Sequence, residues 1–97
     1  MSVYLSNALS LNMFESPEGT YKVSRVEEGQ VPKDTAVSAV GHADLARSIG
    51  VEFARRSLAL RKGDILYIAQ YKGPRLPEGA TTLPEGSQVE WFKVVAE

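Results

Sequence analysis

The fold of this chain is decided by one apolar run, Ile65-Leu66-Tyr67-Ile68-Ala69. A short, near-continuous apolar run without polar alternation is typical of a central β-strand that is covered on both faces. The turn residues Lys62-Gly63-Asp64 precede the run, and Gly73 and Pro74 break the chain after it. The run therefore predicts a layered domain with a β-sheet at its centre.

Four further strands are expected around this central one. Residues 3–7 form a second apolar segment that we expect to be buried. Residues 20–26 and 89–95 are rich in β-branched and aromatic side chains, which favour strands. A last strand is expected to begin at residue 56 or 57 and to end at residue 60, where it leads into the central turn.

Two short helices are expected between these strands. Residues 34–40 fit a helix that is closed by Gly41, and residues 44–49 fit a second helix that is closed by Gly50. Together, the elements predict a single α/β domain over residues 1–97, with a mixed β-sheet of about five strands flanked by short helices.

Composition excludes several classes of function. No run is long enough to span a bilayer, and the N-terminus lacks the pattern of a signal peptide, so we expect a cytoplasmic protein. The absence of cysteine excludes disulfides and thiolate chemistry, and a single histidine without an acidic cluster argues against a bound metal or cofactor. A net charge of −1 argues against duplex DNA as a partner.

His42 is the only histidine, and it stands just before the second predicted helix. Free backbone N–H groups at a helix N-terminus favour a bound anion. An imidazole beside such an anion can donate a proton to a leaving group near neutral pH. The simpler interpretation is an exposed loop histidine.

Two polar clusters follow predicted strands, where the loops of α/β sheets commonly build ligand sites. Neutral amides and hydroxyls suit a base edge or a ribose hydroxyl, whereas a guanidinium suits phosphate. The simpler interpretations are local backbone capping for the first cluster and a surface ion pair for the second. The first cluster consists of Asn7, Ser10 and Asn12, and the second contains Gln70, Lys72, Arg75 and Glu78.

Three segments resemble, in the same order, the motifs of one family. Val3-Tyr4-Leu5-Ser6-Asn7-Ala8-Leu9-Ser10-Leu11-Asn12-Met13 resembles its opening strand and Asn-Ala/Ser-Asn pattern. Val40-Gly41-His42 resembles its Ile-Gly-His segment, and Arg75-Leu76-Pro77-Glu78-Gly79 resembles its Arg-Leu-x-Glu-Gly turn. The family is that of the viral type III anti-CRISPR ring nucleases, which have relatives encoded beside host type III CRISPR systems. The resemblance extends over nearly the whole chain.

This resemblance implies a homodimeric, metal-independent phosphodiesterase that destroys cyclic tetra-adenylate, the second messenger of type III CRISPR systems. His42 would be the general acid, and Arg75 and Glu78 would belong to the active site. The chain departs from relatives at Asp44, where they have a small hydroxyl residue, and at Lys72-Gly73-Pro74, which lengthens a loop. For the carboxylate of Asp44 two alternatives are open: it caps the helix or it contacts ribose. The ligand-binding residues expected on this basis are Asn7, Ser10, Asn12, Gly41, Asp44, Gln70 and Lys72.

The residue inventory is compatible with this chemistry. RNA carries its own nucleophile, the 2′-hydroxyl, so the protein need only position it, stabilise charge and protonate the leaving oxygen. Three alternatives remain open at this stage. They are a sponge that binds cyclic oligoadenylate without cutting it, a small viral nucleic-acid-binding or structural protein, and a regulatory interaction domain.

Overall fold

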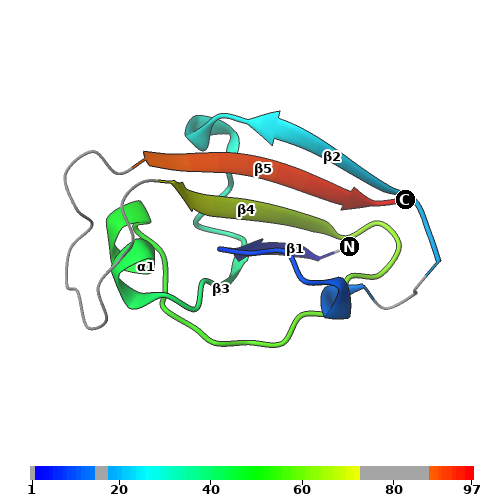
Figure 1. The fold of residues 1–97 in the computed structure, drawn as a ribbon, viewed down its shortest axis with the longest axis horizontal. Helices are drawn as coiled ribbons and strands as arrows, with labels where there is room; N and C mark the ends of the chain where they lie inside the picture. Colours follow the sequence, from blue (N-terminus) through cyan, green and yellow to red (C-terminus); the bar gives the residue numbers. More distant parts are fainter. Residues whose placement is uncertain (1, 15–17, 73–87) are drawn as a thin grey trace.

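Five strands form one mixed sheet in the order β2-β5-β4-β1-β3 (Figure 1). The structure is a computed structural model that describes residues 2–14, 18–72 and 88–97. β1 runs parallel to both of its neighbours, β3 and β4, whereas β5 is antiparallel to β4 and β2. The strands are β1 (Val3–Ser6), β2 (Tyr21–Val26), β3 (Val37–Ala39), β4 (Ile65–Lys72) and β5 (Gln88–Ala96).

The predicted central strand is confirmed, and it extends three residues further than the apolar run. β4 pairs on both sides, and Leu66 and Ala69 are fully buried. Successive side chains alternate between the two faces. Tyr67 and Ala69 join a cluster with Leu5 and Trp91 on one face, while Leu66 belongs to a second cluster on the other face.

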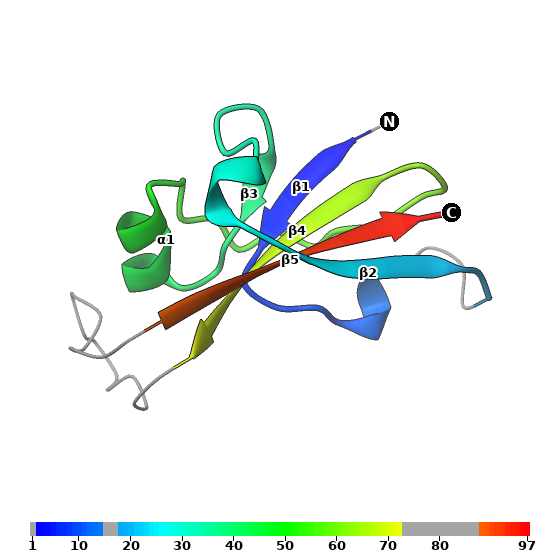
Figure 2. The same cartoon turned by 90° about the horizontal axis from the view of Figure 1, so that it is seen from above.

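Each face of the sheet has its own cover. The helix α1 (Ala43–Ile49) packs Leu45, Ala46 and Ile49 into the first cluster and ends at Gly50, whose φ of 77° is left-handed. Met13, from the short 3₁₀ turn η1 (Leu11–Met13), lies against the second cluster. Figure 2 shows α1 and η1 on opposite sides of the sheet. A second 3₁₀ turn, η2 (Glu28–Gln30), follows β2.

The expected helix over residues 34–40 is wrong, because its second half forms β3. Ser38 explains the difference locally, since its hydroxyl donates to the Glu52 carbonyl at 2.6 Å and accepts the Val40 N–H at 3.4 Å. Val37 and Val40 are β-branched, which favours a strand, and pairing with β1 buries Ala39 and Val40. Tertiary pairing thus overrides the local helix signal.

The strand expected at residues 56–60 is also wrong. The segment makes only an isolated bridge between Phe14 and Leu60, in which Leu60 N–H donates to the Met13 carbonyl. Leu58 and Leu60 are buried in the second cluster, so the segment covers the sheet face instead of extending the sheet. The predicted turn at residues 62–64 is confirmed, with Gly63 at φ 92°.

The sheet and its single described α-helix make one α/β domain, as predicted. Within the described ranges, no helix is long and apolar enough to cross a membrane. The break predicted at Gly73 and Pro74 lies outside the described residues.

Candidate functional site

The carboxyl ends of three parallel strands meet at one edge of the sheet. Ser6, the last residue of β1, pairs with both Ala39 of β3 and Ile68 of β4. The residues that follow these pairs therefore emerge together. They include Asn7, the turn Gly41–His42 and Gln70, so the structure brings the expected polar groups of three separate segments to one place.

His42 begins α1 and is held at two points. Its Nδ1 accepts the Leu45 N–H at 3.2 Å, and its carbonyl accepts the Ala46 N–H at 2.9 Å. The histidine therefore acts as the N-cap of the helix. It bonds one of the backbone N–H groups that were expected to be free to bind an anion. In the neutral ring, the proton then lies on Nε2. The half-buried ring is thus more fixed than an exposed loop histidine.

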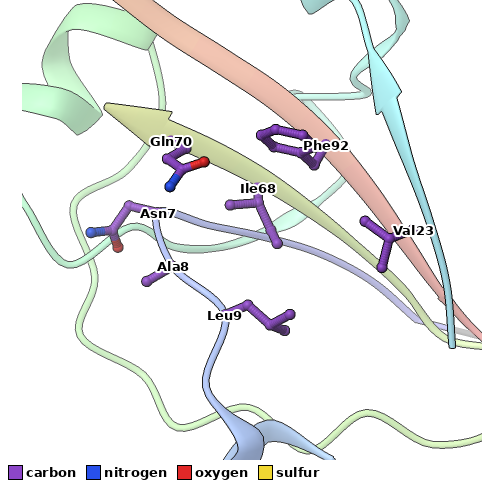
Figure 3. A pocket seen from close by; sticks show the side chains of 7 residues that line it. All are labelled: Asn7, Ala8, Leu9, Val23, Ile68, Gln70 and Phe92. Atoms are coloured by element: carbon purple, nitrogen blue, oxygen red, sulfur yellow. The ribbon is translucent and has the colours of Figure 1, made fainter. Parts of the chain in front are cut away.

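A pocket of about 400 Å³ lies on the face of the sheet that carries the second cluster, opposite the face that α1 covers (Figure 3). Asn7 and Gln70 stand at one end of it, and Val23 stands at the other. The Gln70 amide lies near Ile68 and Phe92, whereas the Asn7 amide is turned outward from them (Figure 3). The pocket thus combines an amide with an apolar wall, which suits a flat heterocyclic ring that carries hydrogen-bonding edges. Its lining residues are Asn7, Ala8, Leu9, Val23, Ile68, Gln70 and Phe92.

Charged groups stand at the same end of β4. Lys72 Nζ lies 3.3 Å from Glu90 Oε1, and Arg25 lies 3.7 Å from Glu90 Oε2. The guanidinium of Arg25 also lies 5.4 Å above the ring of Phe92. Lys72, which was expected to bind the ligand, is therefore an exposed residue of β4 whose ammonium group forms an ion pair with the Glu90 carboxylate.

Ser10 and Asn12 are not brought to His42 within one chain. The Ser10 hydroxyl accepts the Asn12 N–H at 3.3 Å, and its carbonyl accepts the Met13 N–H at 3.0 Å. These bonds are the local backbone capping that the simpler interpretation of the Asn7, Ser10 and Asn12 cluster predicted for Ser10. Figures 1 and 2 show η1 and α1 at opposite ends of the molecule.

Asp44 follows His42 by two residues and is only 8% exposed. The sequence left helix capping and ribose contact as its two alternatives. Since His42 is the residue that caps α1, capping by Asp44 is wrong. Its carboxylate lies in the first helical turn, where negative charge complements the helix dipole.

Arg75 and Glu78, which the resemblance assigns to the active site, lie outside the described residues. Their predicted roles stay predictions. Among the described residues, no group of three or more acidic or histidine side chains could hold a metal ion.

Arg55 is a further residue of this region, and it was not predicted from the sequence. Arg55 packs its stem against Gly41, with its Cγ 3.5 Å from where a Cβ would stand on that glycine. Its guanidinium lies 5.7 Å above the ring of Phe53, which is 46% exposed. The signal was a Phe-x-Arg triplet, because residues two apart share a side in extended chain. Arg55 thus packs its stem against the Gly41–His42 turn and carries its charge over Phe53.

Comparison with known proteins places the chain in a family. A family model described as STIV B116-like matches residues 3–90. The chain belongs to the STIV B116-like family. The solved structure of B116 from Sulfolobus turreted icosahedral virus aligns with 98% of this chain and 99% of its own, with a TM-score of 0.72 and 22% identity.

At that identity the structural likeness establishes the fold: B116 and this chain share one architecture over their whole lengths. No curated protein matches the chain by sequence. The STIV B116-like family takes its name from a viral protein. The chemistry of this member follows from its own residues.

Proposed function

We propose that this protein is a metal-independent ring nuclease. It would cleave cyclic tetra-adenylate into linear di-adenylates with 2′,3′-cyclic phosphate ends, and so switch off type III CRISPR signalling. One observation carries the proposal: His42, whose Nε2 makes no hydrogen bond to the described residues, lies at the same sheet edge as Asn7 and Gln70. The resemblance of three sequence motifs to the ring nucleases supplies the substrate.

Binding of an adenine nucleotide is supported by the pocket. Asn and Gln amides can bond both the acceptor and the donor on one edge of adenine. Phe92 and Val23 provide apolar surface for the face of the base. Arg55, whose stem packs against the Gly41–His42 turn, offers a permanent positive charge for a phosphate of the ring.

The proposed reaction needs no nucleophile from the protein. The ribose 2′-oxygen bonds to phosphorus, its proton passes to solvent, and the bond from phosphorus to the 5′-oxygen breaks. The imidazolium form of His42 donates its Nε2 proton to the departing 5′-oxygen and returns to the neutral ring. In the imidazolium form Nδ1 also carries a proton, so it does not accept the Leu45 N–H until the proton has been transferred. By the resemblance, Arg75 stabilises the charge that develops on the phosphoryl oxygens, and Glu78 completes the active site.

A homodimer remains part of the proposal. A ring of four identical nucleotides has a two-fold axis, so a two-fold dimer gives each subunit half of the same contacts. Ser10 and Asn12 lie at the far end of a subunit from α1, so the proposed contacts from both regions require a ligand that spans subunits. Two His42 residues would then face opposite phosphates of the ring. The proposed location of the dimer is the host cytoplasm.

The test is incubation with radiolabelled cyclic tetra-adenylate in excess chelator, followed by thin-layer separation. The expected result is linear di-adenylate. Activity that is lost in chelator and restored by magnesium would overturn the metal-independent mechanism. Tight binding without any cleavage would identify a sponge, and absence of binding would favour the structural or regulatory alternatives.

A second measurement tests the shared site. Hydrodynamic mass should correspond to a dimer, and mixtures of wild-type and His42→Ala subunits should release linear tetra-adenylate from heterodimers that make a single cut. A protein that stays monomeric when saturated with ligand would overturn the two-fold site.

A further inference from the structure

We infer that Asn7 is a positioning residue for His42, which it orients through the backbone of Gly41. The inference rests on the proposed function for its catalytic consequence, but its structural core is independent. The Gly41 N–H donates to Asn7 Oδ1 at 3.1 Å, across 34 residues of sequence.

The peptide unit between Val40 and Gly41 is fixed from both sides. Its N–H donates to Asn7, and its carbonyl oxygen accepts the Ala54 N–H at 3.0 Å. In a trans peptide these two groups point in opposite directions, so the two bonds fix the tilt of the whole plane. One bond comes from the end of β1, and the other comes from the segment that follows α1.

His42 itself is fixed on its other side by α1, through its carbonyl and Nδ1. The two backbone dihedrals of Gly41 and φ of His42 then separate the fixed peptide from the fixed helix. Glycine is the residue with the widest choice of those dihedrals. Without the bond from Asn7, Gly41 can tilt the preceding plane, and the position of His42 and the start of α1 relative to the end of β1 becomes less defined.

The amide of Asn7 divides its atoms between two tasks. Oδ1 is used by Gly41, whereas Nδ2 donates no described hydrogen bond and belongs to a side chain that lines the pocket. A ligand contact through Nδ2 and a positioning contact through Oδ1 can therefore be separated by substitution. An aspartate keeps the acceptor and removes the donor, and a leucine of similar size removes both.

The experiment compares Asn7→Asp and Asn7→Leu in single-turnover cleavage of cyclic tetra-adenylate at saturating protein. Asn7→Leu should lower the rate constant by about tenfold to a hundredfold, because the acid is misaligned. Asn7→Asp should cleave at least about threefold faster than Asn7→Leu, because its carboxylate still accepts the Gly41 N–H, even where its added charge weakens binding. Rescue by aspartate is a result that a role through Nδ2 does not produce.

Amide hydrogen exchange at Gly41 provides a readout without catalysis. Exchange should accelerate in Asn7→Leu and stay slow in Asn7→Asp. Ser6→Ala is the matched control, because the Ser6 hydroxyl bonds Ala39 and Ala8 at the same strand end and leaves the Gly41 peptide alone. It should lower stability, yet keep both the cleavage rate and the slow exchange of Gly41.

Two results would overturn the inference. In one, Asn7→Leu cleaves at the wild-type rate. In the other, Asn7→Asp is as slow as Asn7→Leu although its Gly41 amide remains protected, which assigns Asn7 to ligand contact alone. If wild-type protein does not cleave the ring at all, the proposed function fails. Gly41 exchange then still decides whether Asn7 orders this turn.

Discussion

The two ends of the parallel strands use polar side chains in different ways. At the amino end, Asp64 is 5% exposed, and both of its carboxylate oxygens accept backbone N–H groups, from Ser2 at 2.9 Å and from Arg61 at 3.0 Å. At the carboxyl end, Asn7 Oδ1 and His42 Nδ1 each accept one backbone N–H, whereas Asn7 Nδ2 and His42 Nε2 make no hydrogen bond to the described residues.

The amino end of the parallel strands uses its polar side chain for stability, whereas the carboxyl end has polar atoms that can bind a ligand. A buried carboxylate whose oxygens are both bonded holds the chain together and offers little to a ligand. Burial alone would raise the pKa of Asp64, but the hydrogen bonds from Arg61 and Ser2 outweigh it and hold that pKa below its ordinary value. Asn7 and His42 differ from Asp64, because each side chain is positioned by one hydrogen bond and has a nitrogen, Nδ2 or Nε2, that can contact a ligand.

The largest effect is expected at the carboxyl end, from His42. His42→Ala should slow cleavage by roughly two to four orders of magnitude and leave ligand binding largely intact, because it removes the proton donor. Single-turnover rates and a separate binding titration measure the two effects. A mutant that cuts as fast as wild type would remove His42 from the chemistry.

His42→Asn sharpens this result, because asparagine is a good N-cap but a poor acid. It should be as slow as His42→Ala, yet unfold with a free energy about 1 kcal/mol closer to wild type. If His42→Asn retained activity, the histidine would serve only as a helix cap.

At the amino end, the expected effect is on stability. Asp64→Ala should reduce the free energy of unfolding by about 3 kcal/mol, because two backbone N–H groups lose a charged acceptor. The cleavage rate should stay within about twofold of wild type at a temperature where the variant is folded. Denaturant unfolding measures the first quantity, and Lys62→Ala, an exposed neighbour, is the control. A loss of activity without a loss of stability would erase the contrast between the two ends.

The lowered pKa of Asp64 also predicts how this contribution depends on pH. A carboxylate with a lower pKa in the folded protein stabilises it above the unfolded value of about 3.9, and the contribution fades as pH falls through the folded pKa. The stability difference between wild type and Asp64→Asn should thus be constant from neutral pH to about pH 5 and shrink below about pH 4. Unfolding curves at several pH values decide this. A difference that grew in acid would contradict the prediction.

The sequence predicted those elements whose local pattern agrees with their tertiary environment. The apolar run of β4, the turn at Gly63 and the helix closed by Gly50 each carry a signal within a few residues. Residues 34–40 and 56–60 were assigned wrongly because their conformation depends on remote partners. β3 needs the edge of β1, and Leu60 needs the Met13 carbonyl.

The site followed the same rule. His42 could be placed before a helix from sequence, and Asn7 could be placed after a strand. Gln70, which was expected after the central strand, belongs to β4 itself. That Asn7 supports Gly41, and that Arg55 packs against the same glycine, depends on which strands are neighbours. Sequence spacing does not contain that information.

The smallest expected effect concerns Lys72, which belongs to the carboxyl end by position but is paired with Glu90. An exposed ion pair of this kind contributes about 0.5 kcal/mol or less to stability, and salt screens it. A double-mutant cycle of Lys72→Gln and Glu90→Gln should give a coupling of that size.

Ligand binding then decides to which side of the comparison Lys72 belongs. If it contributes to the proposed site, Lys72→Gln should weaken binding of cyclic tetra-adenylate by about threefold to tenfold at low salt, with a smaller loss at high salt. Glu90→Gln should strengthen binding slightly, because it frees the ammonium group for phosphate. If neither substitution changes the affinity, Lys72 is a structural surface residue, and the ligand-binding end of β4 stops at Gln70.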